Sequence, residues 1–372
     1  MSKTSIALLA AAVAGGLTSL AAAQANGSYV FTGDSTGSTN ANRVFHLPTG
    51  AASPTIVNDF GSSAWLRGIA VGGNNRLFVG NGPFPVMQPV NTTTMMYTVD
   101  NWFGMAPTVA PLQNGDPIQL PNQHIFHAPY NGLITVNNPG SQTPLPNRSE
   151  GIYHINANTG ATTLMFAEPP PGTALPYYNA GGAVTDWDNN ADTFFVTAVS
   201  GSPTLEPPGG TPGQRASSLH RLDVNPATLA ATETLILDLG NTAQTGFSKP
   251  IGRANGIANV GDSLFIATFD FEDAVGRVFR ADLTPGGTVG SFALVLDNLP
   301  FVNDIVYNPY NGKLALSDRS ATPGIWEFNP NGTGLTKILD DGTRPDRLAV
   351  IPAPSAFALL GLGTLVAARR RR

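Results

Sequence analysis

The sequence predicts an all-β fold, a six-bladed β-propeller that is closed when the last strand pairs with the N-terminal blade. Three observations lead to this prediction. Glycine (41) and proline (31) are abundant among 372 residues, and only 12% of the residues are charged, which favours many short strands joined by turns. A strand–turn–strand unit recurs along the chain, and the two ends of the body carry complementary parts of one further unit.

The recurring unit begins with two alternating strands joined by a tight turn rich in Asn, Gly or Asp, which is the strongest short-range signal for a β-hairpin. It occurs in five stretches, 67–81, 124–138, 182–198, 255–270 and 303–318. Third and fourth strands are expected in 95–112, 151–166, 218–237, 276–296 and 324–339. Four antiparallel strands that repeat in this way are typical of the blades of a propeller, which bury both faces by stacking.

The sixth unit is divided between the two ends of the body. Three strands are expected within 27–60, and the missing first strand is "DRLAVI" at 346–351. Pairing of these segments would close the ring, whereas a linear array of hairpins would leave exposed strand edges. We therefore expect one domain over residues 26–350.

The two termini have the composition of targeting segments. Residues 1–25 contain Lys3, an apolar run and a small-x-small site at Ala23 and Ala25, the pattern of a signal peptide that is removed on export. Near the other end, the apolar run 356–368 is shorter than the ~20 residues that span a bilayer. The arginines after it would stay on the cytoplasmic side, so we expect a transient membrane tether during export.

The segment 351–372 resembles the PEP-CTERM tripartite sorting signals of bacteria. It has a Pro-x-Pro motif, then "FALLGLGTLVAA", then a basic cluster; Ala353 stands where the motif usually has glutamate. The matching residues are Pro352, Pro354, Ser355, Arg369, Arg370, Arg371 and Arg372. The resemblance implies an exosortase-type processing enzyme as partner, and a final location at the cell surface or outside the cell.

Composition and motifs exclude several classes of function. The chain has no cysteine, which excludes disulfides and thiolate chemistry. Its net charge of −5 and the absence of a basic stripe argue against a nucleic-acid partner. No nucleophile elbow, phosphate loop or dinucleotide fingerprint occurs. His46, His154 and His220 each fall in an expected third strand, so we interpret them as repeated features of the blades.

Polar residues stand where the first strands begin, on the face that also carries the long connecting loops. Loops on one face of a rigid scaffold are where binding usually occurs. The residues expected at this channel mouth are Arg67, His124, Asn255, Asn303, Asp304, Asp346 and Arg347. Converging Asn and Asp oxygens suit a hard cation such as calcium. A structural or water-filled channel is the alternative that this pattern leaves open.

The stretches 255–270 and 303–318 are similar to first and second strands of six-bladed propellers of the senescence-marker/gluconolactonase type. This resemblance implies that Asn255, Asn303 and Asp346 are metal ligands; the early ligand glutamate of that family has no counterpart here. No catalytic residue is assigned.

Two classes of function follow from these patterns. The sequence favours an exported cell-surface or matrix protein that binds a carbohydrate, a cell-envelope component or another protein, and it leans against an enzyme. The alternative is a calcium-dependent, lactonase-like hydrolase with its site at the central channel, where the cation would polarise a carbonyl or activate water.

Overall fold

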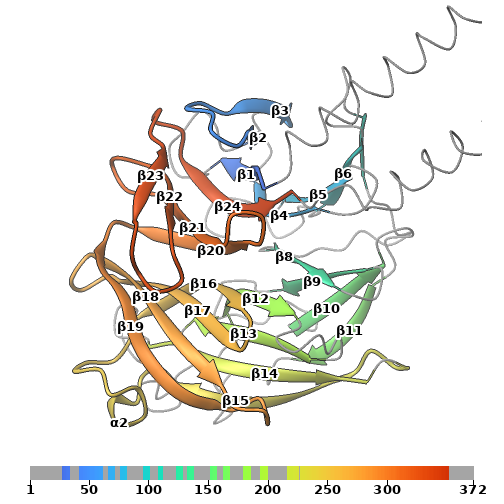
Figure 1. The fold of residues 1–372 in the computed structure, drawn as a ribbon. Helices are drawn as coiled ribbons and strands as arrows, with labels where there is room; N and C mark the ends of the chain where they lie inside the picture. Colours follow the sequence, from blue (N-terminus) through green and yellow to red (C-terminus); the bar gives the residue numbers. More distant parts are fainter. Residues whose placement is uncertain are drawn as a thin grey trace, which may run out of the picture.

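In the computed structural model the chain is nearly all β and propeller-like, with its strands in four-stranded antiparallel sheets (Figure 1). The structure describes residues 27–33, 42–61, 66–71, 76–81, 95–100, 108–111, 123–128, 132–137, 151–156, 162–167, 179–185, 193–199, 216–225 and 227–351. Six such sheets lie within these residues. Both predicted targeting segments lie outside them, apart from Ile351, and none of the described helices is long and apolar enough to cross a membrane.

Sheets 1 to 3 contain the strands of the N-terminal half and one strand from the end of the body. Sheet 1 contains β24 (Pro345–Val350), β1 (Tyr29–Gly33), β2 (Arg43–Leu47) and β3 (Thr55–Asp59). Sheet 2 contains β4 (Leu66–Val71), β5 (Leu77–Asn81), β6 (Met95–Asp100) and β7 (Thr108–Pro111). Sheet 3 contains β8 (Gln123–Ala128), β9 (Gly132–Asn137), β10 (Gly151–Asn156) and β11 (Thr162–Ala167).

Sheets 4 to 6 follow in sequence order. Sheet 4 contains β12 (Asn179–Thr185), β13 (Thr193–Val199), β14 (Ser218–Val224) and β15 (Ala231–Asp238). Sheet 5 contains β16 (Arg253–Val260), β17 (Ser263–Asp270), β18 (Val275–Leu283) and β19 (Val289–Leu299). Sheet 6 contains β20 (Val302–Asn308), β21 (Lys313–Asp318), β22 (Gly324–Phe328) and β23 (Thr336–Leu339). The short helix α2 (Thr242–Thr245), between sheets 4 and 5, is capped by the Asn241 side chain.

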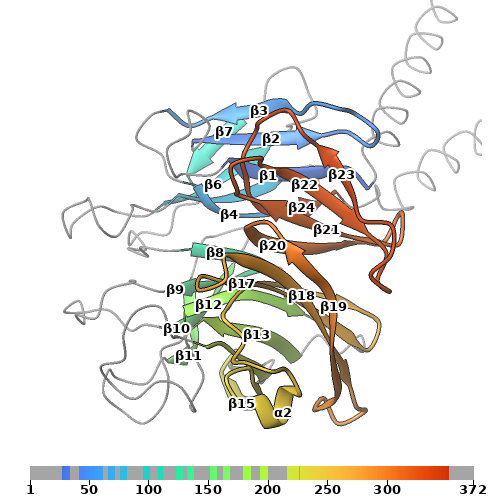
Figure 2. The same ribbon diagram turned by 90° about the vertical axis from the view of Figure 1, so that its left-hand side faces the viewer.

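The first strands of the sheets lie toward the middle of the molecule and the fourth strands at its edge (Figures 1 and 2). Neighbouring first strands contact one another in the order β4, β8, β12, β16, β20, β24 and again β4. Strand β24 pairs with β1, as expected from the sequence, and Val350 lies opposite Tyr29 and Leu348 opposite Phe31. The last strand of the body is thus part of the same sheet as the first.

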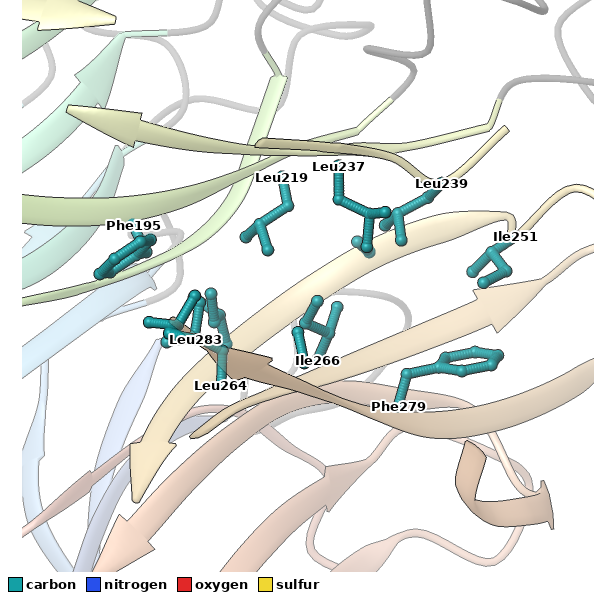
Figure 3. Packing of buried hydrophobic residues seen from close by; sticks show 12 residues of the cluster. Phe195, Leu219, Leu237, Leu239, Ile251, Leu264, Ile266, Phe279 and Leu283 are labelled. Carbon is teal, nitrogen blue, oxygen red and sulfur yellow. The ribbon is translucent and has the colours of Figure 1, made fainter. Parts of the chain in front are cut away.

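Apolar side chains fill the spaces between neighbouring sheets. In the largest described cluster, Phe195 and Leu219 of sheet 4 pack against Leu264, Ile266 and Phe279 of sheet 5 (Figure 3). Similar clusters join sheets 5 and 6, 6 and 1, 1 and 2, and 3 and 4. Burial of each large side chain stabilises the fold by roughly 1.5–3 kcal/mol, so inter-sheet packing is the main support of the scaffold.

Between sheets 6 and 1 this packing is joined by a buried polar network. The Tyr29 hydroxyl donates to Glu327 Oε1 at 2.7 Å, and Asn308 Nδ2 donates to the Gly27 carbonyl oxygen at 2.7 Å. Burial raises the pKa of Tyr29 above its ordinary value, so its hydroxyl stays a donor. Side chains far apart in sequence therefore fix the junction of the two ends.

The outer strands share a β-bulge that the sequence pattern did not predict. In five sheets, a residue of the fourth strand is inserted between two residues that pair with consecutive residues of the third strand. These residues are Val57, Met165, Ile236, Val295 and Ile338, and β19 has a second such residue, Gly290. Bulges increase local twist and disrupt the free edge of a sheet, which discourages pairing with another chain.

Candidate functional site

A β-bulge also occurs in five of the six described first strands, close to where each strand begins. One residue is inserted in β4, β12, β16 and β20, and two residues of β24 face Thr32 alone. The bulged residues are Arg67, Gly181, Asn255, Asn303 and the pair Asp346–Arg347. Bulges re-aim side chains and are common next to functional sites. Most residues that the sequence placed at the channel mouth stand at these bulges.

The residue after the bulge differs between sheets according to how much room the neighbouring first strand leaves for a side chain. It is glycine in β4, β12 and β16, but Asp304 in β20; in β24 the second residue of the bulged pair is Arg347. A Cβ added to Gly256 would lie 2.8 Å from the Ile305 nitrogen and 2.9 Å from the Asp304 Cα. Such distances are below van der Waals contact, so glycine lets β20 approach β16 closely.

The two bulged asparagines connect consecutive first strands. Asn255 Nδ2 donates to the carbonyl oxygen of Val302 in β20, and Asn303 Nδ2 donates to that of Asp346 in β24, each at 3.2 Å. Both asparagines are almost fully buried. The Asp346 carbonyl oxygen also accepts from the Ser317 hydroxyl at 2.9 Å, so side chains of two strands converge on it.

The buried pair Asp304 and Arg347 spans three sheets. Arg347 Nη1 donates to the carbonyl oxygens of Asn255, at 2.9 Å, and Asn303, at 3.3 Å, and lies 3.7 Å from Asp304 Oδ1. Asp304 Oδ2 accepts from the Leu348 backbone N–H at 2.9 Å. Burial raises the pKa of Asp304 to about 6, against the opposing effect of Arg347. Burial likewise lowers the pKa of Arg347. These two residues hold the scaffold together under the site.

Asp346 carries the second buried carboxylate, with 2% of the residue exposed. Its Oδ1 accepts from Asn303 Nδ2 at 2.5 Å and lies 3.4 Å from Arg319 Nη1. The same Arg319 nitrogen donates to Asn303 Oδ1 at 3.3 Å. We call these three residues the carboxylate–guanidinium cluster. A carboxylate and a guanidinium held together by an amide can act as a proton acceptor and an oxyanion-binding group.

Asn255 has the corresponding place in the neighbouring strand but a different environment. Its Oδ1 is buried and has no hydrogen-bond partner within the residues that the structure describes. A buried carbonyl oxygen without a donor costs free energy, so this atom is suited to a bound water or ligand hydroxyl.

The donor set predicted for calcium was tested against this geometry. Arg319 lies against oxygen atoms of Asn303 and Asp346, and the Asn303 amide nitrogen rather than its oxygen faces Asp346. Among the described residues, no three His, Cys, Asp or Glu side chains are grouped as a metal site. A guanidinium next to two of the three predicted ligands would repel a divalent cation, so calcium could bind there only if Arg319 moved away.

The remaining predicted residues have the following places. The structure describes the backbone of Arg67, at the β4 bulge, and of His124, at a regularly paired position opposite Val136 in β8. The sorting-signal residues, Pro352, Pro354, Ser355 and Arg369 to Arg372, lie outside the described part. The long loops of the sequence pattern, at 81–94, 137–150 and 200–217, also lie outside it except for residues 81, 137, 216 and 217.

Arg319 and its aromatic surroundings were not predicted from the sequence. Arg319 directly follows β21, and a second strand ends on the face where the first strand begins. A position directly after a second strand is the one sequence signal that could have identified Arg319. Its guanidinium lies 5.6 Å from the ring centroid of Phe301, a cation–π contact.

The three histidines lie in third strands, as interpreted from the sequence: His154 and His220 are buried and His46 is partly buried. His220 lies 2.6 Å from the Ser218 hydroxyl through Nε2, and its Nδ1 contacts Glu233. This Ser–His–Glu order is that of a hydrolase triad, but Ser218 is fully buried inside sheet 4. The arrangement therefore stabilises the sheet. Burial lowers the pKa of His46 to about 4 and also lowers that of His154.

Comparison with known proteins identifies the fold. No family model matches the chain, and no curated protein matches it. Among solved structures, it is similar to the periplasmic gluconolactonase of Pseudomonas aeruginosa, with 12% identity and a TM-score of 0.53, over 88% of this chain and 99% of that one. It is also similar to TolB from Acinetobacter baumannii, with 11% identity and a TM-score of 0.53, over 87% of this chain and 66% of that one.

A further structure, a putative 6-phosphogluconolactonase from Bacteroides fragilis, has 12% identity and a TM-score of 0.49, over 87% of this chain and 98% of that one. At such identities the similarity establishes the fold alone. It is consistent with the gluconolactonase-type resemblance of the body. The expectation that leaned against an enzyme is contradicted, because this is a fold in which a gluconolactonase has been solved.

Proposed function

We propose that the body is a closed six-bladed β-propeller and a lactonase-like hydrolase, with its site at the carboxylate–guanidinium cluster. Six four-stranded sheets, the circular order of contacts between first strands and the β24–β1 pairing support the closed ring. The observation that carries the activity is the buried Asp346 carboxylate held 3.4 Å from Arg319 and bonded to Asn303.

The proposed reaction is the addition of water to a lactone. Water attacks the carbonyl carbon, the ring C–O bond breaks, and the product is a hydroxy acid. Asp346 takes the proton from water and returns it to the departing ring oxygen, while Arg319 stabilises negative charge on the carbonyl oxygen. Asn303 positions Asp346 through its amide group. Asn255 lies in β16, which contacts the β20 strand that carries Asn303. Its Oδ1 could accept a hydrogen bond from a substrate hydroxyl.

Hydrolysis of a panel of γ- and δ-lactones by the purified body tests this proposal. Asp346→Asn should lower kcat/KM by about 10²-fold or more, because general base catalysis contributes at least that much. Asp340→Asn, at an exposed position, is the control and should keep full activity. Thermal unfolding of both variants separates loss of chemistry from loss of fold. Absence of lactone hydrolysis by the wild type would overturn the proposal.

The calcium prediction remains, with its own test. Calorimetric titration of the body with calcium should detect binding that Asp346→Asn removes, if the cation site predicted from the sequence exists. Such binding would require Arg319 to move away from Asp346. The carbohydrate or cell-envelope ligand predicted from the sequence is tested in the same way, by titration with soluble glycans.

We also propose that the chain is exported and sorted by its ends. The support is the three-part order of residues 351–372 and the signal-peptide pattern of residues 1–25. Mass spectrometry of the protein at the cell surface should find a product that lacks residues 1–25 and the terminal arginines. An intact arginine terminus on the released protein would contradict processing by an exosortase-type enzyme.

A further inference from the structure

Three phenylalanines form an aromatic cluster on the face where the first strands begin, and we call them the phenyl platform. Phe269 is the last residue but one of β17, Phe271 lies in the turn after that strand, and Phe301 lies between β19 and β20. The ring centroids of Phe269 and Phe301 are 4.2 Å apart, and that of Phe271 is 5.0 Å from Phe269. Phe269 is buried at its base, whereas Phe271 is 56% exposed. Phe301 is partly exposed, so Phe301 and Phe271 present apolar ring surface to solvent above a buried Phe269.

The phenyl platform is continuous with the carboxylate–guanidinium cluster. Arg319 lies over the Phe301 ring at 5.6 Å and also 3.4 Å from Asp346 Oδ1. One guanidinium therefore contacts both the aromatic surface and the proposed base. A ligand whose carbonyl group binds at Arg319 would extend its remaining atoms over Phe301 and Phe271.

The charges around the phenyl platform disfavour an anionic ligand. Lys249 contacts Asp270 and Asp273, and Arg277 contacts the same two carboxylates as well as Asp297. These basic side chains are thus engaged by carboxylates, and Glu272 adds a further negative charge next to Phe271. Arg319, over Phe301, is itself paired with Asp346, and Arg253 stands opposite Phe269 in the pairing of β16 with β17. Because Lys249, Arg277 and Arg319 are each paired with a carboxylate, little positive charge is left for a phosphate or carboxylate group.

We propose that the phenyl platform is a substrate subsite that binds the hydrocarbon substituent of an uncharged lactone. This inference rests on the proposed hydrolase activity and adds the class of substrate. The apolar substituent removes phenyl surface from water, and the lactone ring carries no charge that the surrounding carboxylates would repel.

Hydrolysis kinetics with three δ-lactones test the subsite: an unsubstituted ring, the same ring with a five-carbon chain, and a phosphorylated sugar lactone. The alkyl lactone should have the highest kcat/KM and the phosphorylated one the lowest. Phe271→Ala should lower kcat/KM about tenfold for the alkyl lactone and leave the unsubstituted one unchanged. Leu294→Ala removes an equally apolar exposed side chain from β19, at 40% exposure, and should change neither.

Binding of the corresponding alkyl lactam separates this inference from the proposed function, because a lactam resists hydrolysis. Lactam binding that Phe271→Ala weakens supports the subsite even if no lactone is hydrolysed. Equal hydrolysis of the alkyl and unsubstituted lactones, unchanged in Phe271→Ala, overturns the subsite and leaves the hydrolase intact. If the protein neither hydrolyses lactones nor binds the lactam, the hydrolase and the subsite are both overturned. A preference for the phosphorylated lactone overturns the subsite alone.

Discussion

Strands β16 and β20 have the same bulge and a buried asparagine at the same position, but they make different contributions to the site. In both, the asparagine amide donates to a backbone carbonyl oxygen of the next first strand. In β16 the following residue is Gly256, and the Asn255 oxygen has no donor among the described residues. In β20 it is Asp304, and the Asn303 oxygen accepts from Arg319. The same bulge thus allows β20 to approach β16 closely at Gly256 in sheet 5, and in sheet 6 it holds the charged Asp304 and the Asn303 oxygen that accepts from the Arg319 guanidinium.

The difference depends on compensation of charge. Asp304 is acceptable in β20 because Arg347 of the neighbouring strand and two backbone N–H groups offset part of its desolvation. In β16 the same position faces the β20 backbone, which leaves no space for a side chain. The polar centre is therefore asymmetric although the sheets repeat.

The largest expected effect comes from removal of the positive charge. Arg347→Met should destabilise the protein by about 3–5 kcal/mol, because it leaves the buried Asp304 carboxylate without its partner. Chemical denaturation measures this change. The control, Arg43→Met, breaks an exposed pair with Asp59 and should cost less than about 1 kcal/mol. Recovery of much of the loss in the double variant Arg347→Met/Asp304→Asn would identify the unpaired carboxylate as the cause.

Much of the architecture could be predicted from the sequence. Alternating strands and Asn/Gly turns defined the sheets, and the unpaired strand 346–351 indicated its partner near Tyr29. The polar residues at the start of first strands were recognised for the same reason, because the repeats align them. These features depend on local pattern, which a single sequence carries.

The bulges and the division of roles could not be predicted. An inserted residue changes which face its neighbours point to, and nothing in "VND" or "ANG" distinguishes a bulge from regular pairing. Arg319 was not predicted because it follows β21 of sheet 6 and contacts Asp346 in sheet 1. Such a contact between sheets depends on the bulges in β20 and β24, which the sequence does not show. The calcium prediction rested on the oxygen atoms of Asn and Asp side chains, and the sequence alone does not place the Arg319 guanidinium beside them.

The second expected effect is a pH dependence that belongs to β20 alone. The pKa of Asp304 rises from 3.8 in the unfolded chain to about 6 in the folded protein, so the folded protein holds a proton that the unfolded chain has released between these values. This contribution to stability is complete below pH 3.8 and is lost as the pH rises through about 6.

The wild type should therefore be more stable relative to Asp304→Asn at pH 4 than at pH 7, by about 2 kcal/mol. Other titrating groups contribute to both proteins and cancel in the difference. A difference that is independent of pH would show that Asp304 is ionised in the folded protein over this range. The counterpart strand β16 has no such group, since Gly256 stands at that position.

The third effect tests the close approach of β16 and β20. Gly256→Ala should destabilise the protein by about 1–3 kcal/mol, because the new methyl group meets backbone atoms of β20 that cannot move independently. Gly286→Ala is the matched control, since a Cβ there meets only a Thr284 hydroxyl at 3.8 Å. Thermal unfolding of both variants measures the contrast, and equal midpoints would show that the two strands separate at little cost.

The smallest expected effect separates the two asparagines themselves. Asn303→Ala removes the bonds to the Asp346 carbonyl and carboxylate and the acceptor for Arg319, whereas Asn255→Ala removes one bond, to Val302. Each buried hydrogen bond contributes about 1 kcal/mol, and Asn255→Ala also removes an oxygen that lacks a described donor. Asn303→Ala should therefore be the more destabilising by about 1–2 kcal/mol in urea unfolding. In lactone hydrolysis, Asn303→Ala should lower kcat, because Asp346 loses the amide that positions it, while Asn255→Ala should raise KM for substrates with a hydroxyl group. If both variants lose the same stability and the same activity, the two strands are equivalent, and the asymmetry inferred for the polar centre is wrong.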